Sequence, residues 1–321
     1  CRACNVSLWQ AKIGGWTTNR LPTRSPALRS TSRDRWWRVS GSTLDVPLLL
    51  VDGMNLLFRA WFGFPARIRS RDKRRDLTGV FGFFALLRVA IREVPAAPEV
   101  IVVFDGEGAW DDRLALDPTY KAHRSTDPDA LAPIRSLPSV YAGLDVLGIS
   151  RVESETVEAD DLIATLTVRS AAQSVYVLSM DRDFYQLVDD RVRILNTARP
   201  SDRRILESKD IEARFGVLPR QWCDRTALVG DPSDGIPGVR GIGPVWAARL
   251  LADGLRLEDL PVSGRLTGRA GQLVAASLDQ ALRWRELIRL RTNISVPVRT
   301  TGRPSAPLPA AAEVVAALEL W

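Results

Sequence analysis

Three apolar runs in the first two thirds of the chain each end in an aspartate. They are Leu48–Val51 with Asp52, Val100–Phe104 with Asp105, and Val175–Met180 with Asp181. Helical periodicity occupies residues 81–92 and 159–172 between them. Continuous apolar runs are typical of strands that are buried on both faces, and their alternation with helices indicates a parallel sheet. The predicted fold class is α/β.

The pattern changes after about residue 215, where no further strands are predicted. A glycine-rich stretch, PGVRGIGP at 237–244, precedes helical patterns at 246–251 and 273–290. We therefore expect an α/β core over 46–215 followed by a smaller helical region over 216–302.

The two ends of the chain lack a sustained period. Residues 1–45 are rich in Arg, Ser, Thr and Trp, and we expect a flexible basic extension. Residues 303–321 are rich in Pro and Ala, and we expect a tail that is only partly ordered.

Composition describes a soluble globular protein, with 45% hydrophobic and 26% charged residues among 321. No apolar run approaches the length of a membrane span, and no signal peptide opens the chain. These features predict a cytoplasmic, nucleoid-associated protein without membrane contact. The net charge of +6 resides in residues 1–45, which hold eight bases and two acids, so 36 bases and 36 acids remain elsewhere.

Few cysteine and histidine residues are present, which restricts the metal chemistry. Cys1 and Cys4 form a single CxxC pair, Cys223 lies far away, and His123 is alone. A structural zinc site needs four such ligands, so a metal here would be bound by oxygen, as Mg²⁺ and Mn²⁺ are. An odd cysteine count also favours a reducing compartment.

Carboxylates are the strongest candidates for chemistry. Because ligands of a parallel sheet bind beyond the carboxyl ends of its strands, the three strand-terminal aspartates should converge. Further acids lie at a predicted helix start, after the third strand and in a turn-rich loop. They are Glu158, Asp160 and Asp161, then Asp183, then Asp231 and Asp234. Taken singly, helix caps and Asx turns would explain them.

A shared site for these acids would need cations. Carboxylates about 4 Å apart repel by roughly 4 kcal/mol at an effective dielectric near 20. Two Mg²⁺ ions would relieve this repulsion and could stabilise the attacking and leaving oxygens of a phosphodiester. The predicted chemistry is phosphoryl-transfer hydrolysis.

An ordered set of motifs between Leu48 and about Leu251 resembles the 5′ nuclease (flap endonuclease) family, in particular the 5′-3′ exonuclease domain of bacterial DNA polymerase I. The motifs are LLLVDGMNLLFR, TGVFGF, VVFDG, YKAHR, VEADDLIA, SMDRDFYQL and TALVGDPSDGIPGVRGIG. The resemblance implies a PIN-like or resolvase-like core, and it places all nine acids at metal-binding positions. They are Asp52, Asp105, Glu158, Asp160, Asp161, Asp181, Asp183, Asp231 and Asp234.

The resemblance also implies roles for basic residues. Arg113, Tyr120, Lys121 and Arg124 match a helical arch, here near 107–127, under which single-stranded DNA passes. Arg113, Lys121 and Arg124 would stabilise charge on the scissile phosphate. Arg59 is placed similarly. A solvated helix face is the structural alternative.

The glycine hairpin resembles a helix-three-turn-helix that binds duplex DNA, with a potassium ion. The implied contacts are Gly238, Arg240, Gly241, Gly243 and Arg249. The family commonly continues with a Lys-Thr pair, whereas this chain has Pro244-Val245-Trp246.

The sequence therefore predicts a monomeric, two-metal 5′-3′ exonuclease and flap endonuclease. Its partners would be DNA with 5′ flaps, nicks or recessed 5′ ends and a DNA polymerase. Two alternatives are a branched-DNA-binding module without catalysis and a PIN-type ribonuclease.

Overall fold

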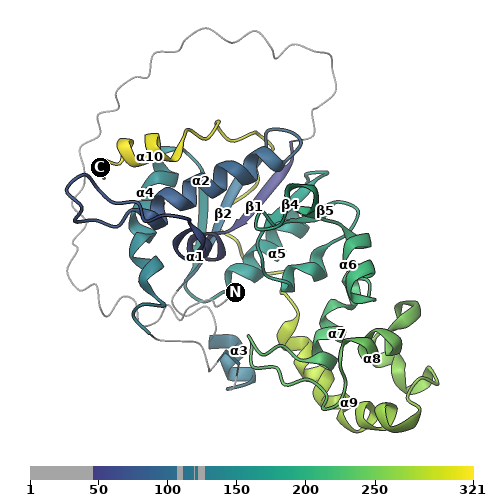
Figure 1. Ribbon diagram of the computed structural model, residues 1–321. Coiled ribbons are helices and arrows are strands. Elements are labelled where there is room, and N and C mark those ends of the chain that lie inside the picture. Colours follow the sequence, from purple (N-terminus) through teal and green to yellow (C-terminus); the bar gives the residue numbers. More distant parts are fainter. Residues whose placement is uncertain (1–45, 107–110, 119, 122–126) are drawn as a thin grey trace, which may run out of the picture.

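The computed structural model describes residues 46–106, 111–118, 120–121 and 127–321. A six-stranded sheet in the order β3-β2-β1-β4-β5-β6 forms its centre (Figure 1). All neighbouring strands run parallel except β6, which is antiparallel to β5. The strands are β1 (Leu48–Asp52), β2 (Glu99–Asp105), β3 (Ser150–Ser154), β4 (Val175–Leu178), β5 (Val192–Leu195) and β6 (Ile205–Leu206).

The predicted α/β class and the three apolar strands are confirmed, as β1, β2 and β4. Three further strands were not predicted from sequence. β3 lies at the sheet edge with most of its side chains exposed or half-buried, and β5 and β6 are only four and two residues long. Short or half-polar strands lack the apolar run that signals a buried one.

Among the described residues, helices separate and follow the strands. They are α1 (Gly53–Gly63), α2 (Thr78–Glu93), α3 (Asp111–Leu116), α4 (Leu137–Val146), α5 (Ala159–Arg169), α6 (Ser208–Phe215), α7 (Trp222–Val229), α8 (Pro244–Leu250), α9 (Gly268–Ile288) and α10 (Ala311–Ala317). The four helical patterns read from the sequence correspond to α2, α5, α8 and α9. Within the described residues, none of these helices combines the length and apolarity of a membrane span.

Successive residues of each strand point to opposite faces of the sheet. In β1, Leu48 and Leu50 pack on the face covered by α5, whereas Leu49 and Val51 pack on the face covered by α1, α2 and α4. The α5 face continues without a break into the helical region, because Val274 and Ala281 of α9 belong to the same apolar cluster. The helical region is therefore packed onto one face of the sheet region.

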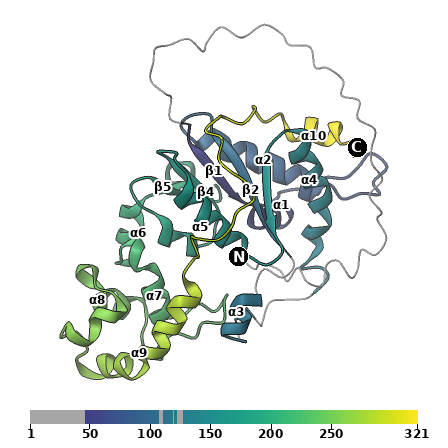
Figure 2. The ribbon, with the colours of Figure 1, turned by 180° about the vertical axis from the view of Figure 1, so that it is seen from behind.

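The C-terminal segment returns to the sheet region, so the expectation of a partly ordered tail is wrong. Figure 2 shows the chain after α9 running back to α10, which lies beside α2 and α4. Backbone and hydroxyl groups of Thr301 donate to the Glu99 carboxylate, and Ser305 Oγ accepts from Val100 N at 2.9 Å. Val314 and Val315 are buried. The apolar spacing of so short a helix was too weak a sequence signal beside its Pro/Ala-rich neighbours.

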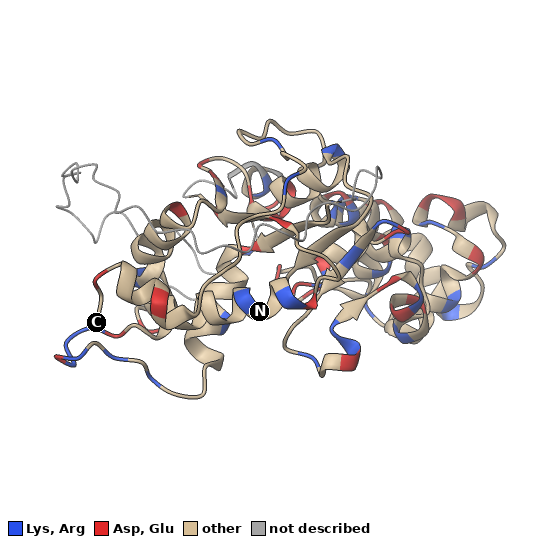
Figure 3. Cartoon of the chain, turned by 90° about the horizontal axis from the view of Figure 1, so that it is seen from above, with Lys and Arg blue, Asp and Glu red and all other residues tan. Residues whose placement is uncertain are grey.

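Basic and acidic positions are interspersed along both regions, as Figure 3 shows. Residues 1–45, which carry the predicted basic extension together with Cys1 and Cys4, lie outside the described residues, as does His123.

Candidate active site

The carboxyl ends of β1 and β2 place two acids side by side. Asp52 ends β1 and caps α1, where its Oδ1 accepts from Asn55 N at 2.9 Å and its Oδ2 accepts from Ser179 Oγ at 2.8 Å. Asp105 ends β2, and its Oδ1 accepts from Ala159 N at 2.8 Å. Strand direction and local hydrogen bonds thus orient both carboxylates at the carboxyl ends of the parallel strands.

Asp160 and Asp181 join these two acids. Burial raises the pKa of Asp52 to about 7; the hydrogen bond from Asn55 opposes this shift, and the charges of Asp105 and Asp181 add to it. Burial also raises the pKa of Asp160 well above its usual range, together with the charges of Asp181 and Asp52. The four carboxylates therefore interact electrostatically as one group.

A second group shares Asp181. Burial raises the pKa of Asp183 well above its usual range, and the charges of Asp181, Asp234 and Asp231 add to the effect. Asp183 opens the 3₁₀ helix Asp183–Leu187, and its backbone N donates to Asp181 Oδ1 at 3.0 Å. We call the two overlapping groups the carboxylate cluster, which comprises Asp52, Asp105, Asp160, Asp181, Asp183, Asp231 and Asp234.

The loop between α7 and α8 supplies the last two members. Asp231 Oδ1 accepts from Ser233 N at 2.8 Å and from its hydroxyl, so the structural alternative of an Asx turn also applies here. Asp231 and Ile236 exchange backbone hydrogen bonds of 2.8 and 2.9 Å. The Asp234 carbonyl accepts from Lys121 N at 3.2 Å, which ties this loop to the segment after α3.

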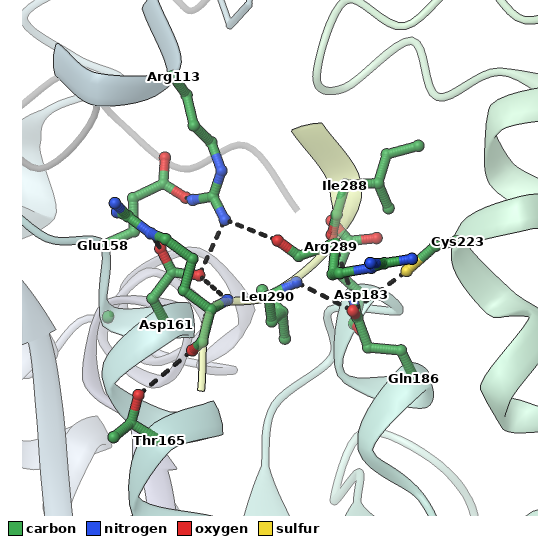
Figure 4. Close-up of polar contacts among 12 residues, drawn as sticks. Arg113, Glu158, Asp161, Thr165, Asp183, Gln186, Cys223, Ile288, Arg289 and Leu290 are labelled. Atoms are coloured by element: carbon green, nitrogen blue, oxygen red, sulfur yellow. Dashed lines mark hydrogen bonds and ion pairs between the residues drawn. The ribbon is translucent and has the colours of Figure 1, made fainter. Parts of the chain in front are cut away.

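Glu158 and Asp161, by contrast, are paired with cations. Glu158 accepts from Arg113 and, at 2.9 Å, from Lys121 Nζ, and the Tyr120 hydroxyl lies 3.5 Å from both of its carboxylate oxygens. Asp161 Oδ1 accepts from Arg113 Nη2 at 2.9 Å. Positions three apart share a helix face, which explains why Arg113 reaches both acids (Figure 4).

The described residues of the expected arch motif are buried, so the solvated-face alternative is wrong for Arg113, Tyr120 and Lys121. Arg113, Tyr120 and Lys121 are 5%, 4% and 8% exposed. Burial would lower the pKa of Arg113, but Glu158 and other neighbours raise it above its ordinary value. Burial raises the pKa of Tyr120 well above its ordinary value. Arg124 lies outside the described residues.

Arg59 of α1 contacts a different element. Its Nη1 donates to Thr197 Oγ1 at 2.5 Å, in the connection between β5 and β6. Burial and the nearby Arg204 lower the pKa of Arg59.

The glycine hairpin divides into a packed part and an open part. Gly238 is buried at φ +70°, and a Cβ there would lie 2.4 Å from the backbone N of Gly230. Gly241 also has positive φ, at +85°, whereas Gly243 caps α8 at φ −96°, and a Cβ at Gly243 would meet no atom within 4 Å. Arg240 and Arg249 are exposed, and the Arg249 guanidinium lies 5.4 Å from the ring centre of Trp246.

Comparison with known families accounts for nearly all of the described chain. The 5′-3′ exonuclease N-terminal resolvase-like domain matches residues 47–216, and the 5′-3′ exonuclease C-terminal SAM fold matches 217–307. The chain belongs to the 5′-3′ exonuclease family. The resemblance read from the motifs is thereby confirmed.

Individual members of the 5′-3′ exonuclease family differ in how much of their length is shared. The 5′-3′ exonuclease of Streptomyces coelicolor is 33% identical over 284 residues, which cover 82% of this chain and 92% of that protein. The thermostable DNA polymerase I of Thermus thermophilus is 34% identical over 255 residues. Those residues cover 78% of this chain but only 29% of the polymerase.

Solved structures share the fold. A T5 5′-exonuclease with bound zinc ions has a TM-score of 0.62 and 22% identity, covering 85% of this chain and 93% of that one. The bacteriophage T5 flap endonuclease, solved as a pseudo-enzyme-product complex with DNA and metal ions, gives a TM-score of 0.62 over the same shares. These similarities support a resolvase-like core joined to a helical region.

The carboxylate cluster suits a hard divalent cation by its chemistry rather than by a preformed geometry. Across the described residues, no three His, Cys, Asp or Glu side chains are already grouped so that they could hold a metal ion. Every donor in the cluster is, however, a carboxylate oxygen, as Mg²⁺ and Mn²⁺ prefer. Burial, with the charges of neighbouring aspartates beside it, raises the pKa values of Asp52, Asp160 and Asp183, and a bound cation would favour their charged forms.

Sequence reasoning missed three residues around this site. Ser179 donates to Asp52, Gln186 donates to the Asp183 carbonyl, and Arg291 donates to Asp161. Ser179 and Gln186 lie within the SMDRDFYQL motif, so their proximity to the acids was available as a signal. Arg291 is 130 residues from its partner, and no local pattern marks it.

Proposed function

We propose that this protein is a divalent-metal-dependent 5′-3′ exonuclease and 5′ flap endonuclease that hydrolyses DNA phosphodiesters. The observation that carries the proposal is the carboxylate cluster, in which aspartates from five separate parts of the chain come together. Burial and the charges of neighbouring aspartates raise the pKa values of Asp52, Asp160 and Asp183. Such an arrangement costs stability unless cations bind there. Membership of the 5′-3′ exonuclease family supports the reaction class.

Two metal ions, Mg²⁺ or Mn²⁺, fit the two groups of carboxylates. Asp52, Asp105, Asp160 and Asp181 would hold one ion, and Asp181, Asp183, Asp231 and Asp234 would hold the other. When bound, such a pair supplies stabilisation for the attacking and leaving oxygens of the phosphodiester. Zinc ions in one T5 structure and metal ions in another support the use of a divalent metal.

Arg113 and Lys121 are the cations best placed to act on the substrate. Both contact Glu158, and Lys121 also interacts with Asp160 and Asp183 across the cluster. If a phosphoryl oxygen of the substrate took the place of the carboxylate partner, each cation would neutralise the negative charge that builds on the phosphate during hydrolysis. Arg124 belongs to the same proposal from its sequence position, as does Glu158 as a metal-site acid.

Binding of the duplex is assigned to the helical region. The exposed Arg240 and Arg249, with the open backbone at Gly241 and Gly243, would hold phosphates, and a potassium ion would bind at this hairpin. Gly238 serves the turn itself, and Arg59 and Tyr120 would contact the strand near the cluster. The substrates would be DNA with 5′ flaps, nicks or recessed 5′ ends. The protein would act as a monomer in the cytoplasm, with a DNA polymerase as its partner.

Cleavage of a 5′-labelled flap DNA tests the proposal. We expect cutting near the flap junction with Mg²⁺ or Mn²⁺ and none with EDTA. Asp181→Ala should reduce the rate by about 10³-fold or more, since Asp181 belongs to both groups, while the Kd for DNA measured in EDTA changes little.

Other outcomes would assign a different function. A near-normal cleavage rate of Asp181→Ala in Mg²⁺ would contradict the two-metal assignment. Tight binding of flap DNA without cleavage in either metal would indicate a branched-DNA-binding module. Preferential cleavage of a matched RNA flap would indicate a PIN-type ribonuclease.

A further inference from the structure

The last residue of α9 and the three residues that follow it pass between two parts of the active site and are held on both sides. We call Ile288–Arg291 the crossover segment. On the α5 side, Arg291 N donates to Asp161 Oδ1 and Arg291 Nε donates to Asp161 Oδ2, both at 2.8 Å. Thr165 Oγ1 donates to the Arg291 carbonyl at 3.2 Å. Backbone and side chain of one residue are thus fixed to α5.

Gln186 holds the other side of the crossover segment. Its Nε2 donates to the Ile288 carbonyl at 3.2 Å and to the Asp183 carbonyl at 2.8 Å. Its Oε1 accepts from Leu290 N at 3.0 Å and from Cys223 Sγ at 3.1 Å. One amide therefore joins the crossover segment, the Asp183 backbone and α7.

Arg113 makes the third attachment. Its Nη2 donates to Asp161 Oδ1 at 2.9 Å and to the Arg289 carbonyl at 3.4 Å. Figure 4 shows Arg113 and Asp161 on one side of the crossover segment and Gln186 and Cys223 on the other. The four residues of the crossover segment consequently connect α5, the Asp183 loop and Arg113.

Asp161 is engaged differently from the members of the carboxylate cluster. It is 0% exposed, and its two oxygens accept two hydrogen bonds from Arg291 and one from Arg113. A buried carboxylate bound in this way is already neutralised by its protein partners. It has little to gain from a metal ion.

We propose that the crossover segment is a brace for the metal site, with Arg291 and Gln186 as positioning residues, and that Asp161 acts through Arg291 rather than as a metal ligand. The proposal rests on the proposed metal-dependent function. Residues that orient metal-binding side chains typically change metal affinity or activity by about 10- to 100-fold when they are removed. The brace fixes α5, which carries Asp160, relative to the Asp183 loop.

Manganese binding to the free protein tests the brace without DNA or catalysis. Titration with Mn²⁺ should show an affinity about 10- to 100-fold weaker in Arg291→Met and in Gln186→Met than in the unmodified chain. Arg291→Lys should recover part of the loss, because it keeps the charge but not the planar donor geometry. Arg299→Met, which replaces an exposed arginine farther along the chain, should bind Mn²⁺ normally.

A double-mutant cycle separates positioning from direct coordination. If Asp161 acts through Arg291, then Asp161→Asn should weaken Mn²⁺ binding about as much as Arg291→Met, and the double variant should be no weaker than either. Loss of one bound ion in Asp161→Asn alone, or multiplied effects in the double variant, would overturn the proposal. So would unchanged Mn²⁺ affinity in a folded Arg291→Met protein.

The same measurements distinguish failure of the brace from failure of the proposed function. An unmodified chain that binds Mn²⁺ and cuts flap DNA, with Arg291→Met equal to it in both, contradicts the brace alone. An unmodified chain that binds Mn²⁺ but does not cut contradicts the nuclease, while the affinity differences still decide the brace. Thermal unfolding of each variant in EDTA identifies unfolded protein, and Thr165→Val, which removes one hydrogen bond, provides a milder variant expected to weaken Mn²⁺ binding less.

Discussion

The carboxyl ends of the parallel strands, where the acids lie, differ from the glycine hairpin in which groups are buried. At the strand ends, the Asp52 side chain is only 7% exposed and lies beside other carboxylates. At the hairpin, the charged side chains of Arg240 and Arg249 are in water, and the buried part is the backbone around Gly238. The first arrangement costs free energy through burial and repulsion, whereas the second costs mainly chain entropy.

This difference indicates that the strand ends bind a ligand through strong electrostatic interactions, whereas the hairpin contributes mainly a defined backbone path. The carboxylate cluster and the buried cations Arg113 and Lys121 are preorganised in a medium where electrostatic interactions are strong. The hairpin needs a defined backbone path and exposed charges that salt can screen. Substitutions at the strand ends should therefore have large effects on the cleavage rate, and substitutions at the hairpin should have smaller effects on the affinity for DNA.

Among substitutions of basic residues, removal of the Lys121 ammonium should have the largest effect. Lys121→Ala is expected to lower kcat by about 10²–10³-fold, since a buried cation that faces the cluster is lost. Single-turnover cleavage of flap DNA measures this loss. Lys209→Ala, which removes an exposed lysine on α6, is the matched control and should cleave normally. Equal rates for the two variants would remove Lys121 from the catalytic machinery.

The pH dependence of metal binding comes next. Because the pKa of Asp52 is raised to about 7, the metal-free protein binds a proton that Mn²⁺ must displace at lower pH. Affinity for Mn²⁺ should fall by about tenfold per pH unit below pH 7 for each displaced proton. Isothermal titration between pH 5 and about pH 8 tests this expectation, and a flat profile would contradict it.

Stability in EDTA should respond to pH in the opposite sense. A carboxyl group whose pKa is raised in the folded state stabilises the protein below its unfolded pKa and loses that contribution as the pH rises through about 7. The unfolding temperature in EDTA should therefore fall between pH 5 and about pH 8, and it should fall less in Asp52→Asn.

Two glycines of the hairpin should differ although they lie close together in the sequence. Gly238→Ala forces a Cβ to 2.4 Å from the Gly230 backbone at positive φ and should destabilise the fold by about 1–3 kcal/mol or more. Gly243→Ala meets no atom within 4 Å and should leave the unfolding temperature nearly unchanged. Thermal unfolding compares them. A stable Gly238→Ala protein would show that the loop can be rebuilt.

Exposed arginines of the hairpin should have the smallest effects. Arg240→Gln and Arg249→Gln should each weaken DNA binding by a few fold and reduce the slope of log affinity against log salt by about one. Binding in EDTA at several salt concentrations measures both values. Arg92→Gln on α2 is the control, and the same slope in all three variants would place the duplex elsewhere.

The sequence supported much of the fold because the informative patterns were local. The runs ending at Asp52, Asp105 and Asp181 predicted β1, β2 and β4, and periodicity predicted α2, α5, α8 and α9. The edge strand β3 and the two short strands β5 and β6 gave no comparable pattern. The return of the C-terminal segment to Glu99 depends on contacts 202 residues apart, which no local signal carries.

The acids of the site were all identifiable from the sequence, because strand-terminal aspartates and the family's motifs are properties of short segments. Tertiary structure alone decided their environments. It grouped seven aspartates by mutual charge, paired Glu158 with Arg113 and Lys121, and surrounded Asp161 with Arg113 and Arg291. Burial and charge proximity arise only when distant segments pack together, so a residue's type predicts its possible chemistry and its neighbours determine which part of that chemistry it performs.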